Sequence, residues 1–195
     1  HYRVHVLDLP GFGRSPVGNG PYTLDTLADT VLQVMPERAH LLGWSLGGMV
    51  ATQIAVQAPE RVNKLITAGS NARFAQSADW VHATKLSVLH SFREQLAEDY
   101  ETTLIKFLAI TTMGSETQKD DIKVLKETVL LHGLPAPQAL RGGLDILRDA
   151  DLRADLKRLQ VPMLRLYGRL DALVPVAVAD ATADLLPEGA AFRQQ

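Results

Sequence analysis

Cysteine is absent from the 195 residues of this chain, which excludes disulfide scaffolds, thiolate zinc sites and cysteine nucleophiles. A large excess of one charge is also absent, because 20 Lys and Arg against 22 Asp and Glu give a net charge of only −2. A protein without a basic field has little attraction for nucleic acid. No apolar run approaches the roughly 20 residues of a membrane span, and the N-terminus lacks the pattern of a secretory signal. We therefore expect a cytoplasmic protein that has neither nucleic acid nor a membrane as its partner.

What is present is an ordinary globular composition, with 46% apolar and 22% charged residues. A chain of this length buries enough surface for one core with an appendage. The first residues, His1 to Leu7, resemble the inside of a strand. We therefore expect the chain to begin within a domain rather than at the start of one.

The first third of the chain alternates between short apolar runs and amphipathic segments. Apolar residues recur at spacings of three and four from Thr23 to Met35, which predicts a helix capped near Thr23. Apolar runs that end in Gly or Pro predict strands buried on both faces. This alternation is typical of a parallel sheet with right-handed crossovers. We predict strands at 4–7, 40–44 and 62–68 and helices at 46–58 and 23–35.

The pattern changes after residue 71 and returns near the C-terminus. Residues 80–148 are almost all helix-like, with amphipathic pieces at 84–112 and 116–131. Strand signals then resume. We predict a strand at 161–168, a helix at 174–186 and the start of a further strand at 190–193. The fold class is therefore α/β, with a parallel sheet formed by residues 1–75 and 151–195 and a helical insertion at 76–150.

Ser45 lies in the sequence Gly43-Trp44-Ser45-Leu46-Gly47, which matches the pattern G-x-S-x-G. The match follows a predicted strand and opens a predicted helix, which is the arrangement of a nucleophile elbow. A serine in such a turn has a strained backbone, so its neighbours must be small. Its hydroxyl would project above the sheet edge, and the backbone N–H of Leu46 would point to where an oxyanion forms. The alternative is a glycine-rich turn that merely joins two elements.

Asp171 is the candidate acid that would support such a serine. It follows the strand predicted to end at Gly168, so it lies at the same sheet edge as Ser45. In this arrangement the chain order is Ser, then an acid, then His. The acid would orient a histidine and stabilise its imidazolium form. The alternative is an aspartate that caps the following helix.

No histidine follows Asp171 in this sequence. Those in the first third lie in or beside predicted strands, and the others belong to the helical insertion, where a solvated or packed role is the simpler explanation. We therefore expect the base to lie beyond the last predicted strand, outside this chain. The six histidines are His1, His5, His40, His82, His90 and His132.

Residues 6–15, 42–48 and 166–171 resemble the α/β-hydrolase superfamily. Within it, the chain resembles the carboxylesterases that hydrolyse the methyl ester of a pimeloyl chain on acyl carrier protein in biotin synthesis. The likeness includes the insertion, which differs strongly between subfamilies. The matching stretches of the insertion are 107–109, 112–117, 125–130 and 142–147.

The resemblance implies a hydrolase sheet, truncated at both ends, with the insertion as a helical cap. Ser45 would be the nucleophile, Asp171 the triad acid and Leu46 the oxyanion donor, while Trp44 and Phe107 would bind the acyl chain. Neither the family's histidine nor its upstream oxyanion loop has a counterpart in residues 1–195, so this chain alone would be an incomplete catalyst.

The resemblance also implies a partner, an acidic acyl carrier protein that presents the ester, and a monomeric enzyme without metal or cofactor. Basic residues of the cap would bind the carrier. A solvated helix face is the alternative for them, because acidic residues are interspersed. The candidates are Lys106, Lys119, Lys123 and Lys126, with Arg141 and Arg148 as further possibilities.

Two other functions remain open from the residues. One is a different serine hydrolase of the same fold, such as a broad carboxylesterase, a carbon–carbon bond hydrolase or a perhydrolase. The other is a binding protein of this fold without catalysis, which the missing histidine favours. Dehalogenases and epoxide hydrolases are disfavoured, because they carry aspartate where Ser45 stands.

Overall fold

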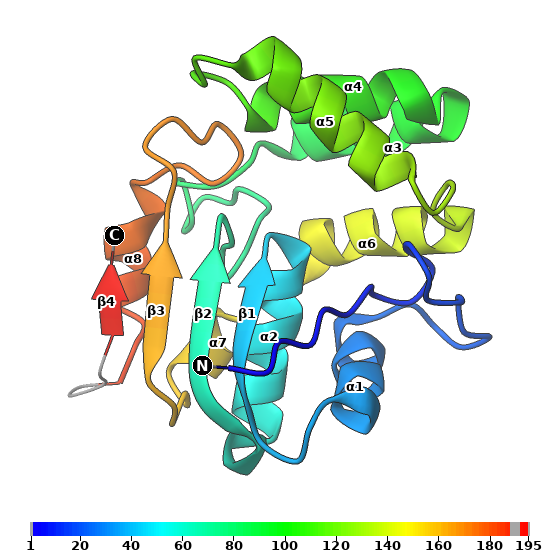
Figure 1. Ribbon diagram of the computed structural model, residues 1–195. Coiled ribbons are helices and arrows are strands. Elements are labelled where there is room, and N and C mark those ends of the chain that lie inside the picture. Colours follow the sequence, from blue (N-terminus) through cyan, green and yellow to red (C-terminus); the bar gives the residue numbers. More distant parts are fainter. Residues whose placement is uncertain (1, 188–191, 195) are drawn as a thin grey trace.

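Figure 1 shows the computed structural model of the chain, which describes residues 2–187 and 192–194. Four parallel strands form one sheet in the order β1-β2-β3-β4. The predicted parallel sheet is confirmed, including the strand that starts near the C-terminus. Residues 190 and 191 of that last prediction lie outside the described residues. The strands are β1 (Ala39–Trp44), β2 (Val62–Ala68), β3 (Met163–Leu166) and β4 (Phe192–Gln194).

Helices α2 (Leu46–Gln57), α7 (Arg153–Leu156) and α8 (Val178–Ala183) lie behind the sheet in the view of Figure 1. Helix α2 connects β1 to β2 and packs on both strands. Helix α1 (Leu24–Val34) packs against α2, and its capping box joins Thr23 with Thr26 as the sequence predicts. The core lies between these helices and the sheet and includes Ile54, Leu65, Leu156 and Val178.

Two predicted strands differ from the structure. Residues 4–7 form no strand, and the side chains of Val4 and Val6 are more than 70% exposed. Strand β1 is buried on one face only, because Leu42 and Trp44 are exposed while the intervening Gly43 is buried. The apolar run predicts burial on both faces, whereas the described part of the chain covers only one face of β1 with helices.

Helices α3 (Leu86–Glu98), α4 (Tyr100–Thr111) and α5 (Gln118–Leu130) form a layer above the carboxyl ends of the strands (Figure 1). They pack on one another, and α6 (Pro137–Asp149) packs against α3. The amphipathic piece predicted at 84–112 is helical but not continuous, because the chain breaks into α3 and α4 at Asp99. The backbone of Asp99 is extended, and its carboxylate accepts a hydrogen bond from the N–H of Thr102, so it caps a new helix.

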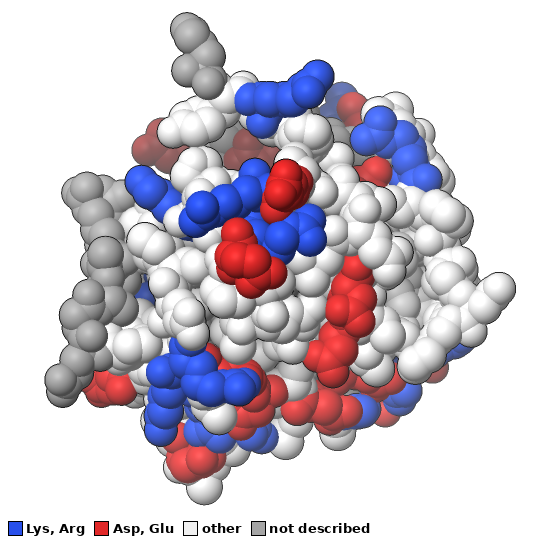
Figure 2. Space-filling model, turned by 90° about the horizontal axis from the view of Figure 1, so that it is seen from below, with Lys and Arg blue, Asp and Glu red and all other residues white. Residues whose placement is uncertain are grey.

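The surface at the amino ends of the strands carries both charges. Figure 2 shows this face, on which Lys and Arg side chains are interspersed with Asp and Glu and separated by uncharged areas. This distribution agrees with the net charge of −2. Within the described residues, no helix combines the length and the apolar character needed to cross a membrane.

Candidate active site

Ser45 lies in the sharp turn between β1 and α2. Its backbone has φ of 53° and ψ of −121°, and it is the one non-glycine residue with positive φ among the residues that the structure describes. Such a conformation is costly for a residue with a side chain and is kept only where the surroundings impose it. The strand–turn–helix context predicted for a nucleophile elbow is therefore present around Ser45.

The glycines beside Ser45 have different surroundings. A Cβ atom at Gly43 would lie 2.2 Å from the backbone oxygen of Gly47, so the strand and the helix approach each other at Gly43. A Cβ at Gly48 would lie 2.5 Å from the side chain of Ser70. A Cβ at Gly47 would meet no atom within 4 Å. Close packing therefore explains Gly43 and Gly48, whereas the position of a Cβ at Gly47 is open and no close approach requires a glycine there.

The end of β2 holds the backbone of Ser45 on both sides. The N–H of Ser45 donates to the carbonyl of Ala68 at 3.0 Å, and the hydroxyl of Ser70 donates to the carbonyl of Ser45 at 2.8 Å. Gly69, with φ of 49°, makes the turn between these two partners. Sequence reasoning missed Ser70, although a polar residue directly after a buried strand at the active edge was the available signal.

The N–H of Leu46 belongs to the first turn of α2, where backbone N–H groups have no partner within the helix. The positive end of the helix dipole lies at the same place. The candidate oxyanion donor is therefore next to the Ser45 side chain, at an end of α2 that favours negative charge.

Asp171 lies at the same edge of the sheet as Ser45, as the sequence predicts. One carboxylate oxygen, Oδ1, accepts hydrogen bonds from the N–H groups of Leu173 and Val174, both at 2.9 Å. The other oxygen, Oδ2, lies above Gly69, because a Cβ at Gly69 would be 3.4 Å from Oδ2 and 3.2 Å from Nε1 of Trp44. Asp171 thus caps a turn with one oxygen, while the other lies beside Gly69 in the turn that follows β2.

The two predicted acyl-binding residues come from separate layers and meet. Trp44 ends β1, Phe107 belongs to α4, and their ring centroids are 6.3 Å apart. Phe92 of α3 continues this row with an edge-to-face contact to Phe107 at 6.2 Å. Trp44 is 56% exposed, so an apolar surface lies directly beside Ser45.

Within the part of the chain that the structure describes, no histidine side chain forms a hydrogen bond with Ser45 or Asp171. His40 packs its ring against Tyr2. Hydrogen bonds from Arg14 lower the pKa of Asp8, and nearby His132 contributes least to this shift. The described residues also contain no group of three or more His, Asp or Glu side chains placed to hold a metal ion.

The predicted docking lysines lie on the helical layer above the site. Lys106 of α4 donates to the side chain of Gln95 at 2.9 Å, and Lys126 of α5 forms an ion pair with Glu101 at 2.6 Å. Lys119 and Lys123 are exposed, and they share one face of α5 because they are four residues apart. No ion pair is found for either of these two among the described residues.

Comparison with known proteins places these features in a family context. Residues 1–194 match the family model of the alpha/beta hydrolase fold. The chain is 52% identical over 179 residues to the pimeloyl-[acyl-carrier protein] methyl ester esterase of Pectobacterium carotovorum, covering 92% of this chain and 69% of that protein. It is 51% identical over 187 residues to the esterase of the same name from Pectobacterium atrosepticum, covering 96% and 72%. A solved esterase from Exiguobacterium antarcticum has the same fold, with a TM-score of 0.81 at 23% identity over 96% of this chain and 70% of that one.

Proposed function

The chain belongs to the α/β hydrolase family, and we propose that it acts there as a serine carboxylesterase on the methyl ester of a pimeloyl chain carried by acyl carrier protein. The observation that carries this proposal is an identity of 52% and 51% to two esterases of that name, in alignments that cover 92% and 96% of this chain and so include the helical layer. The residues that differ most between hydrolase subfamilies are therefore part of the match.

In the proposed mechanism Ser45 Oγ attacks the carbonyl carbon of the methyl ester. The N–H of Leu46 stabilises the oxyanion of the tetrahedral intermediate. The bond to the methoxy group then breaks, and methanol leaves with the proton that Ser45 gave up. Water attacks the resulting acyl-enzyme and releases the free carboxylate while Ser45 regains its proton. Trp44 and Phe107 hold the apolar chain of the substrate beside Ser45.

Both proton transfers need a general base between Ser45 and the carboxylate of Asp171. Oδ2 of Asp171 lies beside Gly69, whose two neighbours both bond to Ser45, and we infer that this oxygen orients an imidazole in that position. The order expected in the family puts this histidine after the last strand. The described part of the chain supplies the nucleophile, the acid and one oxyanion donor.

The substrate class is tested by comparing two esters with the full-length protein. We expect kcat/KM for the pimeloyl-carrier methyl ester to exceed that for a short p-nitrophenyl ester, and Ser45→Ala to abolish both reactions. Equal values for the two esters would instead indicate a broad carboxylesterase.

A non-catalytic binding protein is the second candidate, because no described histidine forms a hydrogen bond with Ser45 or Asp171. A fluorophosphonate probe separates the two functions, since it labels only an activated serine. We expect labelling of the wild-type protein and none of Ser45→Ala. An unlabelled wild type would favour the binding protein.

Carrier docking through Lys106, Lys119 and Lys123 is part of the same proposal, as are a monomeric state and a cytoplasmic location. The exposed lysine pair on α5 supports the docking surface. Size-exclusion chromatography and cell fractionation test the other two statements.

A further inference from the structure

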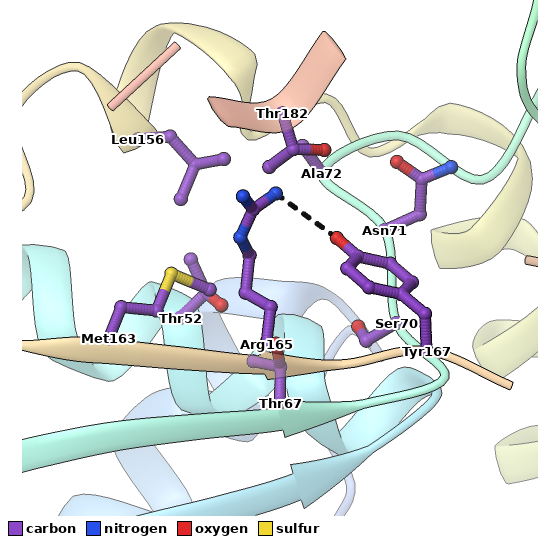
Figure 3. Close-up of a pocket in the computed structure, with 10 residues that line it drawn as sticks. All are labelled: Thr52, Thr67, Ser70, Asn71, Ala72, Leu156, Met163, Arg165, Tyr167 and Thr182. Atoms are coloured by element: carbon purple, nitrogen blue, oxygen red, sulfur yellow. Dashed lines mark hydrogen bonds between the residues drawn. The ribbon is translucent and has the colours of Figure 1, made fainter. Parts of the chain in front are cut away.

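Ser70 is a buried residue directly beneath the elbow. It follows β2, is 7% exposed and lines a small cavity of about 10 Å³ between the sheet and helices α2, α7 and α8. Figure 3 shows it among polar neighbours that include Asn71, Thr52 and the buried Arg165. Its hydroxyl donates to the carbonyl of Ser45 at 2.8 Å, so its hydrogen bond is directed to the elbow.

The carbonyl of Ser45 does not need this bond to be satisfied. The N–H of Gly48 already donates to it at 2.9 Å, as expected at the start of a helix. Gly48 also makes room for Ser70, because a Cβ there would lie 2.5 Å from both Cβ and Oγ of Ser70. Gly48 and Ser70 are thus in contact. The hydrogen bond that this contact allows, from Ser70 to the carbonyl of Ser45, is not needed to satisfy that buried carbonyl.

The geometry of the peptide bond explains what this hydrogen bond does. The Ser45 carbonyl and the Leu46 N–H belong to one planar peptide unit, which is trans because the described residues contain no cis bond. The two groups therefore point in opposite directions. When Ser70 fixes the carbonyl toward the protein interior, the N–H of Leu46 is fixed toward the sheet edge where the oxyanion forms.

The strained backbone of Ser45 makes such a constraint useful. A residue at φ of 53° relaxes by rotating its neighbouring peptide units unless other groups hold them. The bond from Ser45 N–H to Ala68 holds one unit, and the bonds from Ser70 and from the N–H of Gly48 together hold the other. We propose that Ser70 is a positioning residue that aims the Leu46 N–H at the oxyanion, an inference that rests on the proposed esterase function.

Thr52 provides a matched control. Its hydroxyl also donates to a backbone carbonyl at 2.8 Å, that of Gly48, and its side chain is 5% exposed and lines the same cavity. The two hydroxyls differ in the peptide unit that they hold. Ser70→Ala and Thr52→Val each remove one hydroxyl and little volume.

The experiment measures kcat, KM and the melting temperature of the full-length protein and both variants with the carrier-bound methyl ester. We expect Ser70→Ala to lower kcat about 10-fold or more with KM within twofold. A misdirected N–H donor stabilises the transition state less but leaves binding of the substrate unchanged. Thr52→Val should keep kcat within twofold at a similar melting temperature. Ser70→Cys, a weak donor of similar shape, should give an intermediate kcat.

Each outcome decides the proposal. If kcat falls equally in Ser70→Ala and Thr52→Val, or if both Ser70 variants fail to fold, Ser70 is a structural residue and the inference is overturned. A wild-type kcat in Ser70→Ala overturns the inference and leaves the esterase function standing. A wild type that neither hydrolyses the ester nor reacts with fluorophosphonate overturns the proposed function, and this inference with it.

Discussion

The two outer glycines of the G-x-S-x-G motif, Gly43 and Gly47, lie in different surroundings. We expect Gly43→Ala to destabilise the fold by more than about 2 kcal/mol, because its Cβ would lie 2.2 Å from a backbone oxygen that cannot move independently. Gly47→Ala should change the free energy of unfolding by less than about 1 kcal/mol and in the stabilising direction, because alanine is the better helix former. Urea unfolding of the two variants measures both values. Equal destabilisation would show that the motif acts as a unit in folding.

Asp171 has two tasks that substitution can separate. Asp171→Asn keeps an oxygen for the N–H groups of Leu173 and Val174 but has no charge to stabilise an imidazolium. We expect it to unfold like the wild type and to lose about 10³- to 10⁴-fold in kcat. Asp171→Ala should lose the same activity and also about 1–2 kcal/mol of stability, because it leaves the turn uncapped. If Asp171→Asn were fully active, Asp171 would be a capping residue only.

The elbow could be identified from the sequence because the strand, turn and helix that form it are consecutive in the chain. A strand, a small-residue turn and a helix follow one another between residues 40 and 58, and Ser45 has the strained backbone that this order demands. Ser70 escaped notice because its contact with Ser45 joins positions 25 residues apart. A serine after a strand is common, and only the tertiary fold shows which carbonyl its hydroxyl reaches.

At the scale of whole elements, apolar periodicity predicted whether a segment is a helix or a strand better than it predicted where the segment begins and ends. Strand β2 coincides with the predicted range, and α1 and α2 match theirs within one or two residues. The break at Asp99 was missed because apolar spacing continues across it, while a single side-chain cap decides where α4 begins. Residues 4–7 failed as a strand because an apolar, β-rich segment needs a partner strand to become one.

A cluster of ion pairs joins the two ends of the helical insertion. Asp151, after α6, pairs with Arg73 before the insertion at 2.8 Å and with Arg153 at 2.7 Å, while Arg153 also pairs with Asp79 and lies over the ring of Trp80. The hydrogen bonds of Arg153 lower the pKa of Asp151 from 3.8 to about 2. This carboxylate therefore stabilises the fold above about pH 4 and loses its effect as the pH falls toward 2.

We expect Asp151→Asn to cost about 1 kcal/mol at pH 6, after allowance for solvent screening of a partly exposed group. The cost should shrink to about a third of this value at pH 2.5, because the carboxylate of the unfolded chain is then protonated while that of the folded chain is still mostly ionised. Urea unfolding at both pH values gives the difference. A cost that is the same at pH 6 and pH 2.5 would assign the effect to packing rather than to charge.

In the whole molecule, the helical layer lies beyond the carboxyl ends of the strands of the sheet (Figure 1). The site lies where the carboxyl ends of the strands meet that layer, since Trp44 from the sheet contacts Phe107 from α4. A substrate attached to a large carrier must therefore approach past the helical layer. If the carrier docks on this layer as proposed, we expect charge there to affect hydrolysis of the carrier-bound ester and to leave hydrolysis of a small ester unchanged.

Lys119 and Lys123 of α5 allow a test of this difference between the carrier-bound ester and a small ester. We expect Lys119→Glu with Lys123→Glu to lower kcat/KM for the carrier-bound ester about 10-fold at low salt, because reversed charge repels an acidic partner during association. The effect should shrink at high salt, and hydrolysis of a short p-nitrophenyl ester should stay within twofold of wild type. Lys64→Glu is the control, because Lys64 is equally exposed but lies toward the amino end of β2, away from the helical layer. If the control lowered carrier-ester turnover as much as the double variant, net charge rather than a docking surface would govern recognition.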